Sequence, residues 1–289
     1  MLEVFAGSAG LTRAFGAARL LGVAIDHAER AHLPNDFYVV LDLQDKRAQD
    51  DLRKFVRHPD VRHVHFAPPC GTASRARDRP LTKSLRAAGV FEPPPARSDE
   101  FPLGLPDLAR QHPKLAVRVA AANELYDYTA SVCELLSGLG RSWAIENPSN
   151  SYMWLAPGMQ RLLAAGALDV HFDLCMHGGK RKKATCLRCS VSSPLSALSA
   201  QCDGKHAHEP WSYDRGFATA EEAAYPEQLC QTYAQLLSAS LPPRTPLLSD
   251  DVRALRLIAA ADRVGAAIHR LGIRSLSLLP ELRSWLRTT

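Results

Sequence analysis

Residues 61–77 read VRHVHFAPPCGTASRAR, and the fold class is best inferred outward from this stretch. The segment VRHVHFAPP predicts a strand that stops at Pro68 and Pro69, because proline cannot donate to a strand ladder. Cys70 follows the prolines at once, and arginines come after it. Open α/β sheets bind ligands at the carboxyl ends of their strands. The stretch therefore predicts a strand whose carboxyl end presents a thiol.

Strand and helix patterns alternate on both sides of this stretch. Further strands are predicted at residues 2–7, 23–26, 37–43, 141–148 and 169–175. Helices are predicted at residues 11–22, 45–58, 115–140, 159–168 and 221–241. Strands that alternate with helices predict an α/β domain with a mostly parallel sheet.

Four stretches depart from this alternation. Residues 75–115 are rich in proline and arginine and predict a long loop, and loops of that length are usually functional or mobile. From residue 180 to about 215 the pattern breaks into a segment of Cys, His, Gly and Lys. Residues 241–249 predict a linker, and 250–273 predict one more amphipathic helix.

Composition bounds the class of protein. The 289 residues are 46% hydrophobic and 22% charged, as in soluble globular proteins. No run of about 18 apolar residues predicts a membrane span, and the N-terminal residues do not have the pattern of a signal peptide. Seven cysteines without a secretory signal favour reduced thiols or metal ligands, so we expect an intracellular protein, nuclear or cytoplasmic, without a membrane partner. The net charge of +5 permits a polyanionic partner.

Residues that suit ligand binding follow several of the predicted strands. In strand order they are Gly7 with Gly10, Asp26, Asp42, Cys70, and Glu146 with Asn147. Glycines at the first turn let a cofactor approach the backbone, and an acid at the second strand end suits a ribose diol. Each position also has a structural interpretation: a tight turn for the glycines, helix caps for the aspartates, a core thiol for Cys70, and a simple end of strand for Glu-Asn-Pro.

Three motifs in this order resemble DNA cytosine-5 methyltransferases: FAGSAGLTRAF at 5–15, APPCGTASR at 67–75 and IENPSNSYMW at 145–154. The likeness is greatest to divergent Dcm-like proteins of phages and retroelements, and it covers roughly residues 2–240. It implies a Rossmann-like S-adenosylmethionine-dependent methyltransferase fold over residues 1–243, with a small Cys/His-rich insertion at 178–215 for recognition or zinc binding. Residues 244–289 would then form a linker and helical tail. The resemblance implies DNA as the partner.

The resemblance also implies roles for the catalytic residues. Cys70 would be the nucleophile and Glu146 would hold the target base, beside Pro69 and Asn147. A thiolate that adds to carbon 6 of cytosine makes carbon 5 electron-rich enough to take a methyl group. The target base must first be flipped out of the duplex. Among the basic residues of GKRKK, Arg181 and Lys183 are expected to contact the base or the DNA, although a solvated basic loop is the simpler interpretation. The arginines after Cys70 are expected to lower its pKa and to contact phosphate.

The cofactor residues are transferred from the same resemblance. Asp26 would bind the ribose and Asp42 the adenine amine of S-adenosylmethionine. The full set expected around the cofactor is Phe5, Ala6, Gly7, Gly10, Leu11, Asp26, His27, Asp42, Leu43 and Pro68.

The sequence departs from the family in ways that keep two alternatives open. Gly71 stands where the family usually has Gln, the cofactor loop is Gly-Ser-Ala-Gly, and Met1 directly precedes the first strand. A non-catalytic nucleic-acid-binding module of a mobile element is one alternative. Cytosine-5 methylation of RNA, which keeps the chemistry and changes the substrate, is the other.

A second constellation predicts a possible zinc site. TCLRC and CDGKHAH together offer four ligands with one to spare, from Cys186, Cys189, Cys202, His206 and His208. Cys175 and His177 are possible substitutes. The alternative is that the histidines lie at the surface or face DNA, while the thiols belong to the core.

Overall fold

The computed structural model describes residues 1–27, 38–191, 193–213, 216–217, 219 and 221–240. Its main sheet has seven strands in the order β3-β2-β1-β4-β5-β7-β6. They are β1 (Leu2–Val4), β2 (Val23–Asp26), β3 (Tyr38–Val40), β4 (His63–Phe66), β5 (Ser142–Pro148), β6 (Leu168–Asp173) and β7 (Ala184–Cys189). Only β7 runs antiparallel to its neighbours in this sheet. The predicted α/β class with a mostly parallel sheet is confirmed, and the strand order is compatible with a Rossmann-like fold.

Strand β4 has the buried position that its sequence predicts. All four of its residues are buried, and it lies between β1 and β5. The N–H of Ala67 still donates to Val4 O, at 3.1 Å. Pro68 and Pro69 have no N–H, so this ladder cannot continue beyond them. The chain therefore leaves the sheet just before Cys70.

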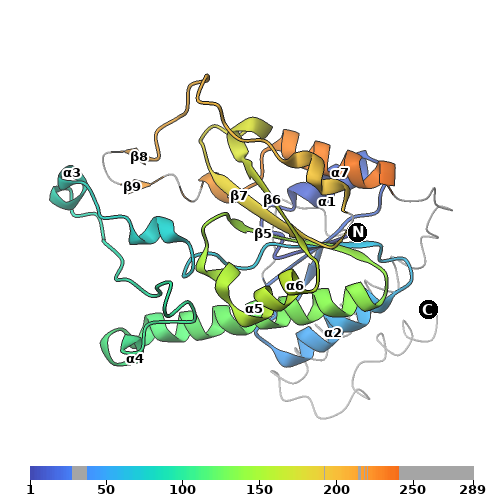
Figure 1. Ribbon diagram of the computed structural model, residues 1–289, viewed down its shortest axis with the longest axis horizontal. Helices are drawn as coiled ribbons and strands as arrows, with labels where there is room; N and C mark the ends of the chain where they lie inside the picture. Colours follow the sequence, from blue (N-terminus) through green and yellow to red (C-terminus); the bar gives the residue numbers. More distant parts are fainter. Residues whose placement is uncertain (28–37, 192, 214–215, 218, 220, 241–289) are drawn as a thin grey trace, which may run out of the picture. The chain divides into compact units, whose positions relative to one another are not determined.

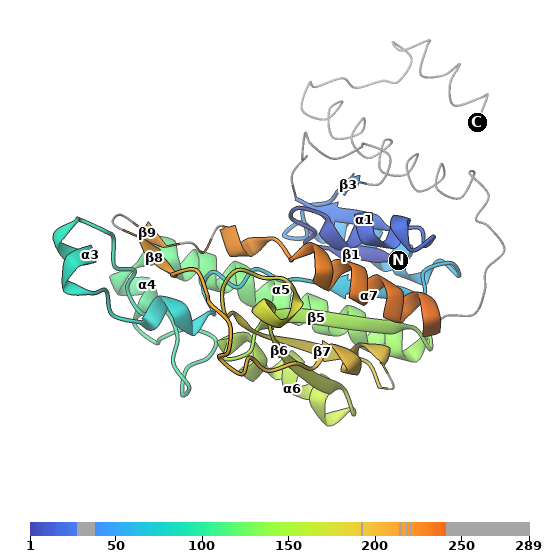
Figure 2. The same ribbon diagram turned by 90° about the horizontal axis from the view of Figure 1, so that it is seen from above.

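Helices cover both faces of the sheet (Figure 1). The longer ones are α1 (Gly10–Ala17), α2 (Lys46–Arg57), α5 (Pro113–Gly138), α6 (Pro157–Ala164) and α7 (Glu227–Ser240). Helices α1 and α7 pack together on one face, as Figure 2 also shows, and α5 packs against α2 and α6 on the other. On the α1/α7 face, Phe15 and Tyr233 join one apolar cluster with Phe172 of the sheet. This burial stabilises the sheet that carries the strand ends.

Shorter elements connect these helices and strands. The Pro/Arg-rich stretch is largely a loop, as predicted, with η2 (Arg75–Asp78), α3 (Lys83–Ala87) and α4 (Leu108–Gln111) along it. The other short elements are η3 (Tyr152–Leu155), η4 (Leu174–His177), η5 (Pro194–Leu198), η6 (Glu221–Ala223) and the strand pair β8 (Ser212–Tyr213) and β9 (Gly216–Phe217).

The segment 180–215 differs from its prediction. We expected no regular element there, but Ala184–Cys189 form β7, which lies between β5 and β6. Five of its six residues are buried, so the cysteines in this strand act as apolar side chains that favour the core.

Residues Met1–Pro242 form one compact unit. The predicted tail over 244–289 lies outside the described residues. Within the described ranges, no helix is both long and apolar enough to cross a bilayer.

The strand directions bring several chain segments to one edge of the sheet. Strands β1, β2, β4, β5 and β6 all run the same way, and β7 starts where β5 and β6 end, with Thr185 opposite Pro148 and Ala184 opposite Asp173. The connections reverse direction between β1 and β4, which is the switch point where open α/β sheets bind ligands. The segments after β1 and β4 are therefore the first place to look for a site.

Candidate active site

The loop that carries Cys70 is held by hydrogen bonds from two neighbouring elements. Asn147 of β5 donates from Nδ2 to Pro68 O at 3.0 Å. Tyr126 of α5 donates its hydroxyl to Pro69 O at 2.6 Å. Cys70 O accepts from the N–H groups of Ala73 and Ser74, at 2.9 and 2.8 Å. The predicted residues Pro68, Pro69 and Asn147 therefore help to fix the position of the Cys70 loop.

Arg97, from the Pro/Arg-rich loop, is a further support that the sequence analysis missed. Its side chain is 3% exposed. It donates to Thr72 O and Thr72 Oγ1, both at 3.0 Å, and to Asn123 Oδ1 at 2.7 Å. Nothing in the sequence distinguishes this arginine from its neighbours, since only the folded loop shows that it turns inward.

Cys70 lies close enough to Glu146 and Lys183 to be influenced by both charges. The thiol is half-buried. Burial raises the pKa of Cys70 first, the Glu146 carboxylate raises it further, and Lys183 opposes the shift. Burial and the Glu146 carboxylate together thus favour the protonated form of the Cys70 thiol.

The expectation that the arginines lower the pKa of Cys70 is corrected by this geometry. Arg75 pairs with Asp99 and donates to Asn150 O, while Arg77 donates to Gly71 O and Pro94 O. The pKa of Cys70 is raised, because burial outweighs nearby positive charge, and the cation that acts on it is Lys183.

Glu146 offers one carboxylate oxygen without a protein donor. The Tyr225 hydroxyl donates to Oε2 at 3.1 Å. Oε1 is buried, and no hydrogen-bond partner for it exists among the described residues. Buried carboxylate oxygens are normally hydrogen-bonded, so Oε1 suits a donor from a ligand.

A cavity of about 130 Å³ lies over the ends of β1, β2 and β3. Its lining consists of Phe5, Ile25, Asp26, His27, Leu41, Asp42, Leu43, Gln44, Pro69 and Leu125. Five of the ten residues predicted around a cofactor are in this lining: Phe5, Asp26, His27, Asp42 and Leu43. The other five, Ala6, Gly7, Gly10, Leu11 and Pro68, lie outside the lining. Pro69 joins the cavity to the Cys70 loop.

The turn after β1 is shaped by Asp26. The Gly7 N–H donates to Asp26 Oδ2 at 2.7 Å, and the His27 N–H donates to Oδ1 at 2.7 Å. Phe5 and Gly7 have left-handed backbones, with φ of 59° and 51°. That conformation is strained for an aromatic residue, and such strain concentrates at ligand sites. Oδ1 also contacts His27 Nδ1 at 2.6 Å, so the remaining capacity of Asp26 for a hydroxyl group lies at Oδ2.

The N-terminus of α1 is capped from inside the sheet. Glu3 Oε2 accepts from the N–H and Oγ1 of Thr12, at 2.7 and 2.6 Å, and Oε1 accepts from the Leu11 N–H at 3.4 Å. Burial raises the pKa of Glu3 to about 7. Dinucleotide-binding folds place a pyrophosphate at this helix N-terminus. Here a carboxylate takes those donors, so the site disfavours a phosphate and suits a nucleoside without one.

Arg181 and Lys183 have separate environments. Arg181 is buried among three acids, at 3.0 Å from Glu209, 3.0 Å from Glu221 and 2.9 Å from Glu222. Its charge is balanced there, which gives it a structural role and corrects the expectation that it meets the base or the DNA. Lys183 donates to Glu222 O at 3.0 Å and acts on Cys70. Of this pair, Lys183 is therefore the residue that influences Cys70.

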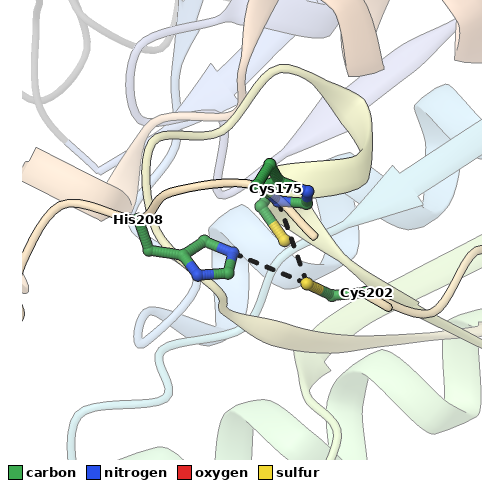
Figure 3. A group of neighbouring side chains, drawn as sticks. Cys175, Cys202 and His208 are labelled. Atoms are coloured by element: carbon green, nitrogen blue, oxygen red, sulfur yellow. Dashed lines mark hydrogen bonds between the residues drawn. The ribbon is translucent and has the colours of Figure 1, made fainter. Parts of the chain in front are cut away.

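The predicted zinc ligands divide into two groups. Cys202, His206 and His208 lie with Cys175, and their ligand atoms are within 4.8 Å of one another. Figure 3 shows Cys175, Cys202 and His208 of this group. Cys186 and Cys189 lie in β7, and they are excluded from this cluster. Residues three apart in a strand point to opposite faces, so these two thiols cannot easily bind one ion. His177 is buried against Leu198 O, at 2.9 Å, which leaves Cys175 as the substitute.

A second group of side chains, Asp169, His171 and Cys186, is also close enough to hold an ion. Asp169 is already bound by Arg188 through two contacts of 2.7 Å. The carboxylate is thus committed to an ion pair, and this group is the weaker candidate.

Comparison of the chain with models of known protein families gives no match, and comparison with curated proteins gives none either. Function is therefore inferred from the site itself.

Proposed function

We propose that the chain transfers a methyl group from S-adenosylmethionine to carbon 5 of cytosine in DNA, through a covalent adduct on Cys70. The observation that carries this proposal is the meeting of Cys70 and Glu146 at neighbouring strand ends, next to the cavity over β1 and β2. A thiol and a carboxyl group are the two side chains that this chemistry requires. The resemblance of the three motifs to cytosine-5 methyltransferases supports the same assignment.

The cavity and its surroundings fit the nucleoside part of this cofactor. Asp26 has capacity for a ribose hydroxyl, and Asp42 and Phe5 line the same cavity. S-adenosylmethionine contains no phosphate, which agrees with the Glu3 cap on α1. When bound, it supplies the methyl group as an electrophile next to Cys70. The buried carboxylate of Glu3 and the acids of the cavity also suit its positive charge.

Cys70 and Glu146 would then act in sequence on the cytosine ring. Cys70 would give its proton to the Glu146 carboxylate, its Sγ would bond to carbon 6, and the ring electrons would move toward carbon 5, which takes the methyl group. Glu146, then protonated, would donate from Oε1 to ring N3, an acceptor, while this charge shifts. A solvent water would take the carbon-5 proton, and the electrons of that C–H bond would restore the ring double bond as the Sγ–C6 bond breaks and the thiolate leaves. Lys183 would stabilise the thiolate, which burial disfavours.

Basic side chains near the Cys70 loop favour a nucleic acid as the substrate. Arg79 and Lys83 are exposed on the segment that follows Cys70. Such residues neutralise phosphates and make binding dependent on salt. A base within a duplex would have to leave the stack to reach Cys70.

A duplex that contains 5-fluorocytosine tests the proposal. Fluorine replaces the hydrogen that must leave as a proton, so the Cys70 adduct cannot break down after methyl transfer. We expect an adduct that survives denaturing electrophoresis with the unmodified protein and S-adenosylmethionine, and none with Cys70→Ala. Cys133→Ala, which removes a thiol inside α5, is the matched control and should keep the adduct.

Three other results would count against DNA methylation. No adduct on any duplex, with cofactor binding shown by calorimetry, would contradict it. An adduct on structured RNA and none on DNA would show that RNA is the substrate of the same reaction. Salt-sensitive DNA binding without cofactor affinity would favour the non-catalytic nucleic-acid-binding module.

A further inference from the structure

The Cys/His cluster is formed by Cys175, Cys202, His206 and His208 (Figure 3). Cys175 belongs to η4, directly after β6, and the other three lie on the segment that follows η5. The two cysteines are half-buried and the two histidines are exposed. Two thiols and two imidazoles are a common ligand set for structural zinc in a reduced compartment. Their position at the surface also leaves an entry path for an ion.

The distances within the cluster agree with a tetrahedral ion. Cys202 Sγ lies 3.5 Å from His208 Nε2 and 3.8 Å from His206 Nε2. Zinc bonds of about 2.3 Å to sulfur and 2.05 Å to nitrogen at the tetrahedral angle separate the two atoms by about 3.6 Å. Both imidazoles approach the same thiol through the nitrogen that commonly binds zinc. These two distances therefore match a zinc site, and all four ligand atoms lie within 4.8 Å of one another.

Groups around the cluster support the ligands. The Cys202 N–H donates to Asp173 Oδ2 at 2.8 Å, which ties the ligand segment to the end of β6. The Gly204 N–H donates to Cys202 Sγ at 3.4 Å, a contact that favours a thiolate. Outer contacts of this kind orient metal ligands and raise affinity.

The segment 202–210, which carries three of the four ligands, also holds the basic residues 180–183 that lead into β7. The Glu209 N–H donates to Lys180 O at 3.0 Å, and Arg181 Nε donates to Pro210 O at 2.8 Å. Lys183, two residues after Arg181, acts on Cys70. A clamp between η4 and the segment 202–208 would therefore fix the position of Lys183.

We propose that Cys175, Cys202, His206 and His208 bind one zinc ion with a structural role. Four protein ligands fill a tetrahedral shell and leave no position for a reacting water. The ion clamps the segment 202–210 and, through it, the basic segment beside Cys70. This site does not depend on the proposed methyl transfer, since it would exist in a non-catalytic protein.

Metal analysis of the full chain, purified under reducing conditions, tests this site. We expect about one zinc per chain in the unmodified protein. Cys202→Ala and His208→Ala should each lose it, with at least tenfold weaker zinc affinity. Cys186→Ala is the matched control and should keep the zinc, because Cys186 is buried in β7.

Cobalt provides a second measurement that does not depend on whether the variants fold. Co²⁺ bound to the unmodified chain should give the intense visible absorption of tetrahedral thiolate coordination, which zinc abolishes. A folded, reduced chain that binds neither ion, or one in which Cys175 and Cys202 form a disulfide under reducing conditions, would overturn the proposal. Equal zinc in Cys186→Ala and Cys202→Ala would also overturn it.

A separate observation concerns a continuous chain of hydrogen bonds behind Glu146. It joins six groups in the order Glu146, Tyr225, His65, Tyr233, His63 and Ser142. The five distances are 3.1, 3.0, 3.1, 2.8 and 2.9 Å. The two histidines are buried in β4, where His63 is the first residue, and Ser142 is the first residue of β5.

The chain can satisfy Glu146 in either protonation state. With Glu146 ionised, Tyr225 donates to it, both histidines carry the proton on Nε2, and Ser142 donates to His63. With Glu146 protonated, every bond reverses, both histidines carry the proton on Nδ1, and Ser142 donates to Arg62 O, which is 3.2 Å away. Burial lowers the pKa of both histidines, so they remain neutral and change only their tautomers.

We further infer that this chain lets Glu146 take up and release a proton during catalysis, with Tyr225 and His65 as positioning residues. This inference rests on the proposed function. Other ionisable groups that interact with members of the chain are Glu3, Cys70, Cys186, Cys189, Cys230 and the N-terminal amine.

Nitrogen NMR of the histidine rings tests the tautomer change without any need for activity. We expect the His63 and His65 signals to change together from the Nε2–H to the Nδ1–H form as pH falls, and Glu146→Gln to remove that change. Signals that stay in one tautomer throughout would overturn the inference. If methyl transfer is measurable, Tyr225→Phe should shift the pH profile of kcat/KM, whereas Tyr152→Phe, whose hydroxyl contacts Asp78, should leave it unchanged.

Discussion

The Cys70 loop and the Cys/His cluster lie at the same edge of the sheet but are held in different ways. The Cys70 loop follows a buried strand and receives hydrogen bonds from α5, β5 and Arg97. The cluster combines η4 with a segment that has neither helix nor strand between η5 and β8. The sheet and its neighbours therefore fix the Cys70 loop. The two segments of the Cys/His cluster lack such support, and we propose that a zinc ion links them.

Glu146→Gln should have the largest effect and should separate the two regions. Gln keeps the size of the side chain and can still accept from Tyr225, but it cannot act as an acid or base. We expect methyl transfer to fall about 10²–10⁴-fold, the range for loss of a general acid or base. Initial rates at saturating cofactor measure this loss.

Zinc content provides the control for Glu146→Gln. It should equal that of the unmodified protein, since Glu146 is not among the cluster's residues. An unchanged rate would remove Glu146 from the chemistry. Loss of zinc from Glu146→Gln would show that the Glu146 site and the Cys/His cluster depend on each other for their structure.

Arg97→Ala should have the next largest effect, on stability. It leaves Thr72 and Asn123 without their buried donor, and changes of this kind cost about 2–4 kcal/mol. Arg86→Ala is the control from the same loop. Arg86 pairs with Glu92 at an exposed site, where solvent screens the charges, so its loss should cost much less than the loss of Arg97. Urea unfolding measures both, and equal losses would contradict the view that Arg97 fixes the Cys70 loop.

The sequence order of strand-end residues predicted much of the sheet edge. Gly7 and Cys70 follow strands and Asp26 and Glu146 lie near strand ends, and parallel strands bring such positions together whatever the loops do. Arg97 could not be predicted in the same way, because its role depends on how a long loop turns inward. The sequence pattern therefore predicted the position of a site residue only where a strand fixes that residue.

The Cys/His cluster was predicted only in part for the same reason. The spacing of Cys202, His206 and His208 placed three ligands on one short segment. The choice between Cys175 and the pair Cys186 and Cys189 depended on recognising β7, whose residues are buried by the sheet rather than by their own pattern. Ligands that come from distant segments require the fold before they can be chosen.

The buried histidines of β4 predict a smaller, pH-dependent effect within the sheet. The unfolded chain binds a proton at His65 with a pKa near 6.5, while burial lowers the folded value to about 3. Between these pH values the unfolded state holds more protons, so the free energy of unfolding decreases as pH falls.

His65→Gln should weaken the dependence of the free energy of unfolding on pH. From pH 7 to pH 5 the unmodified protein should lose about 2 kcal/mol more than the variant does, at about 1.4 kcal/mol per pH unit below 6.5. Glu3 acts in the opposite direction, since its raised pKa favours the folded state as pH falls from 7, but it is present in both proteins. Urea unfolding at the two pH values measures the difference. Parallel losses would show that His65 is protonated in the folded state.

A pair of glycine substitutions gives the smallest effects and compares the two regions directly. At Gly71 a Cβ would meet open space and no positive φ is required, so Gly71→Ala should raise the free energy of unfolding by about 0.4–1 kcal/mol. At Gly178, beside the cluster, φ is +86° and a Cβ would lie 3.0 Å from Gln228 Oε1. Gly178→Ala should therefore lower the free energy of unfolding by about 1–2 kcal/mol. Urea unfolding of the zinc-loaded chain measures both signs. A destabilising Gly71→Ala would mean that the Cys70 loop needs its glycine, and the departure from the family's Gln would then be a backbone requirement of this chain.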